Sequence, residues 1–218
     1  MADALRGAWA YALAHPDRFW QSVITHAQLS GAALGVATAL AVTAGVLVSR
    51  YRRAAPPVLA LASLGRAVPH LAILAALLPL VGIGTRPALI ALVLIAMPPI
   101  LVNTYTGITQ VDPGAVEAAR GMGMSTWTLL WRVELPLVVP VIFAGLRTAA
   151  VNVVASATLA TFIGGGGLGD FIQAGLALND VAQILVGAVP VAGGAVLVDA
   201  CFGGLERWLT PLRGTQGP

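Results

Sequence analysis

Long apolar runs alternate along the chain with short polar stretches rich in glycine, proline and arginine. An α-helix needs about 20 apolar residues to cross the hydrocarbon core of a bilayer. We therefore predict an all-α membrane protein with five spanning helices. The predicted spans are residues 27–49, a stretch that starts near Pro69 and ends before Gly82, and residues 86–108, 137–160 and 181–205.

A proline at position 69 interrupts the apolar stretch that leads to the second span. Because an arginine is costly at the centre of a bilayer, we expect residues 58–67 to form a short helix in the cytoplasmic interface. Arg66 would anchor that helix, and His70 would lie at the inner mouth in a structural role. A role in the solute pathway is the alternative for Arg66, and a role as a proton relay is the alternative for His70.

The first span has small residues at every fourth position, which places them on one helix face. Such a face lets two membrane helices approach closely, so we expect it to pack against a neighbour. Its members are Gly31, Gly35, Ala39 and Thr43.

Residues 1–26 carry aromatic rings and charges instead of a long apolar run, and we interpret them as an interfacial segment. Residues 27–205 would be the transmembrane domain, and residues 206–218 a cytoplasmic tail. Arginines gather in short loops on the cytoplasmic side of membrane proteins. This rule places the N-terminus outside, the C-terminus inside and the loop at residues 111–136 in the cytoplasm. The cytoplasmic arginines would be Arg50, Arg52, Arg53, Arg120, Arg132, Arg207 and Arg213, against Arg6, Arg18 and Arg86 outside.

The loop at residues 111–136 contains acids, arginines and tryptophans in an otherwise apolar chain. Asp112 followed by Pro113 predicts a helix start, and Gly121 and Gly123 predict its end. Ser125 can cap a second helix, which should stop before Pro136. Three apolar residues of that second helix are expected on one face: Trp127, Leu130 and Trp131.

The composition excludes a soluble globular protein, because 58% of the residues are hydrophobic, 10% are charged and the mean hydropathy is +0.87. The net charge of +3 comes from arginines beside apolar segments, so we expect no nucleic-acid partner. The single Cys201 excludes an internal disulfide. The chain contains no catalytic or metal-binding motif, and the glycines at 164–167 lack the Lys-Ser/Thr of a nucleotide loop. We predict transport and not catalysis.

Polar and helix-breaking residues within the spans are candidates for the solute pathway. We expect the proline pair Pro98–Pro99 to bend the third span beside a central cavity, with Asn103 in its polar lower part. Arg147 is too deep to reach the interface easily, and either a structural ion pair or a gate would explain it. Asp199 is expected near the interface, paired with an arginine there, and a functional role of this intramembrane acid is the alternative. The pathway candidates are Pro98, Pro99, Asn103, Arg147, Asn152 and Ser156.

The 111–136 loop resembles the EAA motif of ABC-importer permeases, EAA-x3-G-x9-I-x-LP, with valine at position 133 in place of isoleucine. The resemblance implies a type I permease core of five helices. It also implies that the loop forms coupling helices that dock on an ATP-hydrolysing subunit, with Trp127 and Trp131 bracing the loop against the membrane. The implied coupling residues are Glu117, Ala118, Ala119, Arg120, Gly123, Leu135 and Pro136.

Further segments, among them ARGMGM at 119–124 and GGGGLGDF at 164–171, resemble permeases for glycine betaine, carnitine, choline and proline betaine. The resemblance implies a bacterial inner-membrane subunit that works with ATP-binding cassette subunits, a second permease subunit and an extracytoplasmic solute-binding protein. ATP and magnesium would bind to the partner, and no cofactor to this chain. A methionine-type permease, an osmotically gated channel and a membrane-embedded enzyme are the alternatives.

Overall fold

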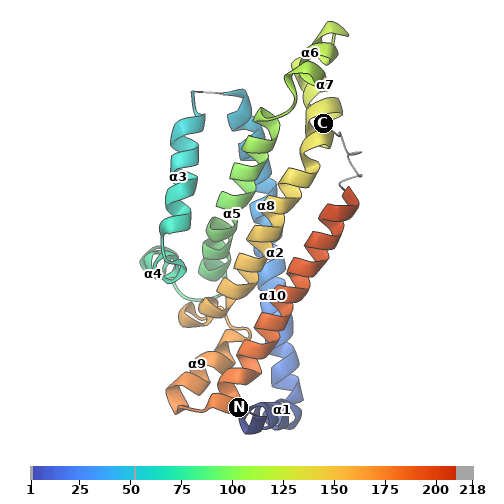
Figure 1. Ribbon diagram of the computed structural model, residues 1–218. Helices are drawn as coiled ribbons and strands as arrows, with labels where there is room; N and C mark the ends of the chain where they lie inside the picture. Colours follow the sequence, from blue (N-terminus) through green and yellow to red (C-terminus); the bar gives the residue numbers. More distant parts are fainter. Residues whose placement is uncertain (1, 52, 210–218) are drawn as a thin grey trace.

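The computed structural model describes residues 2–51 and 53–209, which form helices and turns without any strand (Figure 1). Most of the long helices run side by side as one bundle. Its loop end carries the 111–136 loop, and its opposite end, the α9 end, carries α1 and α9. The elements are α1 (Ala2–Ala14), α2 (Pro16–Arg50), α3 (Ala55–Ala67), α4 (His70–Val81), α5 (Thr85–Thr109), α6 (Pro113–Gly121), α7 (Thr126–Leu129), the π-helical η1 (Leu130–Glu134), α8 (Leu135–Ser156), the 3₁₀ segment η2 (Ala157–Ile163), α9 (Gly169–Leu178) and α10 (Val181–Leu209).

Helix α5 is the centre of the bundle. It packs mainly against α2 and α8 and also contacts α3 and α4. In its most apolar stretch 61% of the residues are buried, against 17% in α10. A helix that is apolar on all sides belongs in such a position, and Leu92 and Ile100 are fully enclosed there.

The face of α2 that packs against α5 is not the one expected. Gly31 and Gly35 have open space around them, and the predicted small-residue face points away from the bundle. The buried face is offset by two residues and consists of Ala33, Ala37, Ala41 and Gly45. Alanines and glycines are so common in this helix that more than one face satisfies the same spacing, and only the position of α5 selects between them.

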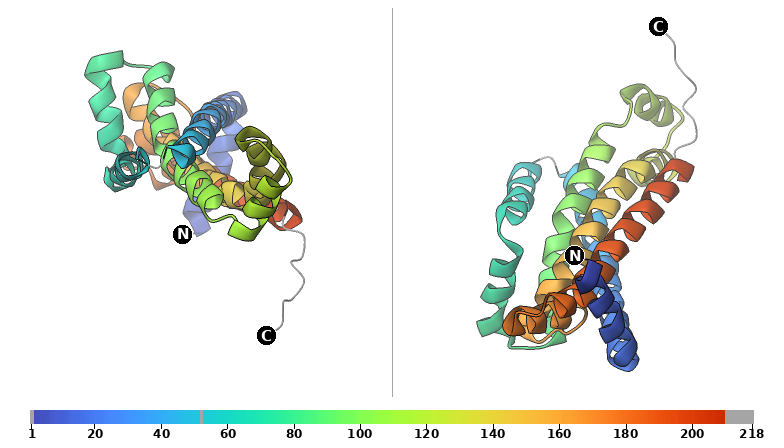
Figure 2. Two further views of the ribbon diagram at one scale, coloured as in Figure 1. Left: turned by 90° about the horizontal axis from the view of Figure 1, so that it is seen from above. Right: turned by 60° about the horizontal axis from the view of Figure 1, so that its bottom comes forward.

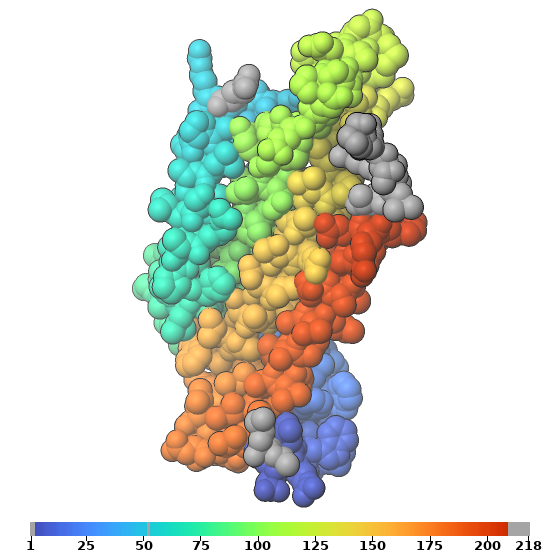
Figure 3. Space-filling model, viewed as in Figure 1, coloured from blue at the N-terminus to red at the C-terminus, as the bar shows by residue number. Residues whose placement is uncertain are grey.

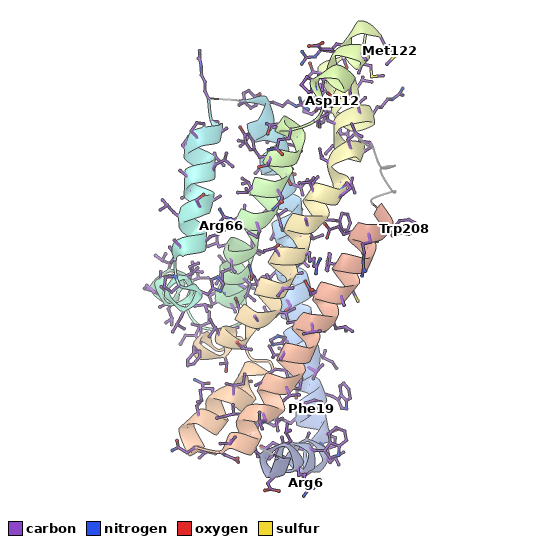
Figure 4. The ribbon with its side chains drawn as sticks, in the orientation of Figure 1. Arg6, Phe19, Arg66, Asp112, Met122 and Trp208 are labelled. Atoms are coloured by element: carbon purple, nitrogen blue, oxygen red, sulfur yellow. The ribbon has the colours of Figure 1, made fainter. Side chains whose placement is uncertain are left out.

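The segment before α5 is broken at Pro69, as predicted, but its two halves are arranged differently from the expectation. Val68 is extended, as a residue before proline prefers, and α4 turns by 102° from α3. Helix α3 lies along α5, whereas α4 lies across the bundle towards the α9 end (Figures 1 and 2). Arg66 is therefore well away from the loop end (Figure 4), and the predicted interfacial position at that end is wrong.

Residues 2–26, the described part of the predicted interfacial segment, are largely helical. They comprise α1 and the first turns of α2, which begins at Pro16 and runs for 35 residues. Together with α9 and α10 they enclose a second small core around Phe171, into which Tyr11 and Phe19 pack. Their predicted place at the membrane interface stays a prediction. Helix α10 continues through the start of the predicted tail, of which residues 210–218 lie outside the described residues.

Four helices of the described chain are long and apolar enough to cross a membrane, and the bent α3–α4 pair would supply a fifth. Three of the four are α2, α5 and α10, and the fourth runs without a break from α7 through η2. The protein is thus an all-α, multi-pass membrane protein, as its composition predicts.

Candidate functional site

The 111–136 loop projects beyond the bundle, with Asp112 at its base and Met122 near its tip (Figure 4). Asp112 caps α6 as predicted, because its carboxylate accepts a hydrogen bond of 3.0 Å from the Gly114 amide. At the other end of α6, the Met124 amide donates to the Ala119 carbonyl at 3.2 Å. Gly123 has a φ of +81°, a conformation that L-residues rarely adopt. The predicted glycine turn is confirmed.

The second helix of the loop differs from the prediction after its first turn. Ser125 caps α7 through a 3.2 Å hydrogen bond from the Thr128 amide, as expected. The helix does not stop before Pro136, however, and continues through η1 into α8. A proline ring clashes with the carbonyl four residues earlier in a regular α-helix. The wider π turn directly before Pro136 relieves that clash.

The three residues predicted to share one face of this helix separate into two groups. Trp127 and Trp131 are mostly exposed, whereas Leu130 is buried against Ile108 and Val138. The two tryptophans therefore form an apolar strip on the outside of the loop. Their predicted role of bracing the loop against the membrane stays a prediction.

The residues of the predicted coupling motif present a mixed surface. Glu117, Ala118, Arg120, Gly123 and Pro136 are exposed. Within the same motif, Ala119 is buried and Leu135 is half-buried. A partner at the loop would therefore meet both charges of α6 and an open glycine turn.

An ion pair that the sequence did not reveal joins the loop to the first long helix. Both guanidinium Nη atoms of Arg50 donate to the carboxylate of Glu134, whose side chain is only 6% exposed. The signal was present in part, because Glu134 is the one acid in a predominantly apolar stretch of the motif and Arg50 ends the first span at the same side. Because the two residues are far apart in the sequence, the sequence alone did not indicate that they pair.

A second charged cluster lies between α8 and α10, which run side by side on one face of the molecule (Figure 3). Arg147 donates from Nε to Asp199 Oδ1 at 2.6 Å and from Nη2 to Asp199 Oδ2 at 2.7 Å. Its Nη1 is 3.6 Å from Glu206 Oε2. The expected ion pair of Arg147 exists, and the partner of Asp199 is this arginine within the bundle.

An open cavity of about 380 Å³ adjoins this cluster. Glu206, which the sequence did not single out, also contributes to it. Two of the pathway candidates, Arg147 and Asn152, line this cavity, and their role in the pathway stays a prediction. The residues that line the cavity are Ala144, Arg147, Thr148, Val151, Asn152, Asp199 and Glu206.

The other pathway candidates lie elsewhere. Pro98 and Pro99 are buried in the packed centre of α5, and the Asn103 amide donates to the Pro99 carbonyl at 2.8 Å. Ser156 is buried at the end of α8, where Oγ and His70 Nδ1 form a hydrogen bond of 2.7 Å. His70 therefore lies near the α9 end, and its predicted position on the side of the loop is wrong. Whether these residues meet solute stays a prediction.

The glycine-rich return at the α9 end is a compact turn. Gly164, Gly166 and Gly167 all have positive φ angles. Asp170 lies inside the first turn of α9, and its carboxylate accepts a hydrogen bond from the Thr161 hydroxyl. Asp180 accepts from the Ala182 amide at 2.9 Å. It thus caps α10.

Residues 31–213 match the sequence pattern of a family described as "Binding-protein-dependent transport system inner membrane component". This chain belongs to that family. The permease is 47% identical over 192 residues to a carnitine transport permease protein of Listeria monocytogenes, covering 88% of this chain and 86% of the relative. It is 42% identical over 192 residues to a glycine betaine/carnitine/choline transport system permease protein of Bacillus subtilis, covering 88% of each chain.

The fold of the permease agrees with that of solved transporters. An inward-facing structure of the methionine ABC transporter MetNI matches with a TM-score of 0.78, covering 89% of this chain and 97% of the other at 20% identity. A likeness at this identity shows the fold alone. The resemblance of the loop motif to ABC-importer permeases is thus confirmed. The chain is a transport subunit.

Proposed function

We propose that this permease imports quaternary-ammonium osmoprotectants, such as glycine betaine, carnitine and choline, with energy from ATP hydrolysis in separate subunits. The observation that carries this proposal is the similarity of most of the chain to permeases named for those solutes, at 47% and 42% identity. The likeness to the methionine transporter is limited to the fold and carries no argument about the solute.

The 111–136 loop is the proposed docking site for an ATP-binding cassette subunit, which would also bind ATP and magnesium. Exposed Glu117 and Arg120 offer charges for the contact, and Gly123 gives the loop a compact tip. A closure of the ATPase would move α6 and α7, and the unbroken helix from α7 to α8 would carry that movement into the bundle. A stiff helical connection suits such a transmission.

The distribution of arginines supports an orientation with the loop in the cytoplasm of a bacterium and the N-terminus outside. Arg50, Arg120 and Arg132 belong to the loop end, together with Arg207 in the last turn of α10. A solute-binding protein would then deliver its cargo at the α9 end. A second permease subunit would complete the pathway, since α10 leaves most of its surface uncovered in this chain.

The test is uptake by proteoliposomes that contain the complete complex of permease, ATPase and binding protein. Labelled glycine betaine, carnitine, choline and methionine are supplied separately, with and without internal ATP. We expect ATP-dependent uptake of the quaternary amines and none of methionine. Uptake of methionine alone would contradict the proposed solute class. Uptake without ATP that responds to osmotic strength would instead identify a channel.

A further inference from the structure

The charged cluster of Arg147, Asp199 and Glu206 combines one positive with two negative groups in the spanning helices α8 and α10. Their side chains are 37%, 45% and 31% exposed. Charged groups in spanning helices avoid lipid and face protein or a water-filled cavity. The open cavity of about 380 Å³ lies on the seam between α8 and α10 and provides such a surface. Thr148 and Asn152 add polar groups to its lining.

The Arg147 guanidinium is held in a defined plane. A methyl group at Gly203 would approach its Cζ and Nη1 atoms to 3.1 Å, so the guanidinium lies directly against the backbone of α10. Two of its nitrogens form a fork that matches a carboxylate. A solute carboxylate has the same geometry as that of Asp199, and it can therefore take the place of Asp199 on the fork.

Aromatic rings lie on the same seam, one helical turn from the charges. Phe143 on α8 and Phe202 on α10 have ring centroids 6.5 Å apart, with the rings tilted by 43°. Phe143 precedes Arg147 by four residues, and Phe202 falls between Asp199 and Glu206 along α10. Aromatic faces attract quaternary ammonium ions in proteins, and carboxylates attract them as opposite charges.

We propose that this seam is a binding station for zwitterions in the solute pathway, which rests on the proposed osmoprotectant function. Arg147 exchanges the carboxylate of Asp199 for that of the solute. Asp199, once released, and Glu206 then face the quaternary ammonium, beside Phe143 and Phe202. The exchange conserves the charge of the cluster, and departure of the solute restores the Arg147–Asp199 pair.

Comparing glycine betaine with choline tests the carboxylate half of this station separately from the ammonium half. Both solutes carry a trimethylammonium group, and only glycine betaine carries a carboxylate. The ratio of betaine uptake to choline uptake is measured in proteoliposomes containing the whole complex and normalised to the unsubstituted complex. The normalisation cancels the preference of the binding protein. Arg147→Gln is expected to lower the ratio by about tenfold, the usual worth of a charge-assisted hydrogen bond. Asp199→Asn is expected to raise it, because the fork is freed while the ammonium loses a partner.

Two glycines on α10 give a matched pair of milder variants. Gly203→Ala crowds the guanidinium and should lower the same ratio by less than Arg147→Gln. Gly204→Ala has no atom within 4 Å of the added methyl group and should leave the ratio unchanged. Gel filtration of each complex identifies variants that do not assemble. If Arg147→Gln is one of them, Arg147→Lys takes its place, because it keeps the charge without the fork. It is also expected to lower the ratio.

Opposite shifts from Arg147→Gln and Asp199→Asn support the station. If assembled variants lose betaine uptake and choline uptake in equal proportion, the ion pair is purely structural and the proposed station is overturned. So does an unsubstituted complex that carries choline but no betaine. If the unsubstituted complex carries neither solute, the proposed function itself fails.

Discussion

Arg50 and Glu134 are 84 positions apart in the sequence, yet the guanidinium of one forms two hydrogen bonds with the buried carboxylate of the other. This pair joins the end of α2 to η1, the part of the 111–136 loop that leads into α8. It therefore fixes the position of the loop relative to the bundle.

Removing one partner of this pair should destabilise the protein strongly. Arg50→Ala leaves a buried carboxylate without compensation, a change that typically costs about 3–5 kcal/mol. Replacing both residues by apolar ones, as in Arg50→Met with Glu134→Leu, should recover most of that loss. Thermal unfolding of the purified permease in detergent provides the measurement. The exposed Glu117→Gln is the control, with a change within about 0.5 kcal/mol. Equal stability of Arg50→Ala and the control would show that the pair is dispensable.

The glycine turn at the tip of the loop should be required for coupling. Gly123→Val forces a β-branched residue to a φ of +81°, where a left-handed conformation costs about 1–2 kcal/mol. We expect the distorted loop to uncouple ATPase activity from uptake in the reconstituted complex. Gly121→Ala, which has open space around it and no positive φ, is the matched control. Normal uptake and normal solute-stimulated ATPase in Gly123→Val would contradict the role of the turn.

The close packing of α2 against α5 should depend on Gly45. A methyl group there would lie 2.7 Å from Thr104 Cβ, so the two helices must separate or bend. Overpacking of this kind costs about 1–3 kcal/mol, and Gly45→Ala should lower the melting temperature. Gly35→Ala on the same helix meets no atom within 4 Å and should not. Indistinguishable melting curves for the two variants would place the packing face of α2 elsewhere.

The cap of α6 should control the local order of the loop. Asp112→Ala removes the acceptor of the Gly114 amide at a cost of about 1 kcal/mol. Hydrogen exchange of α6 is expected to become faster, while exchange in α5 stays unchanged. Asp112→Asn keeps a side-chain acceptor and should exchange nearly as slowly as the unsubstituted protein. Exchange in α6 that does not respond to Asp112→Ala would mean that other contacts hold the helix.

Features that depend on neighbouring residues were predictable from the sequence. Asp112 and Ser125 cap the helices they were expected to cap, because each hydrogen bond spans only two or three residues. The break at Pro69 and the turn at Gly123 follow from the backbone chemistry of proline and glycine. The composition fixed the membrane class, since apolar runs of this length can be accommodated in few other ways.

Features that join distant segments required the tertiary structure. Several helix faces of α2 have small residues at the same spacing, and only the approach of α5 determines which one is buried. Proline at 69 predicts a break but not the direction in which each half continues. Arg147 and Asp199 lie 52 positions apart, and their pairing depends on how α8 and α10 pack. Local hydrogen bonds and the lengths of the apolar segments can be predicted from the sequence, because they depend on residues that are close together in the chain. The choice among equivalent helix faces and the pairing of distant charges are decided only when all the helices pack together.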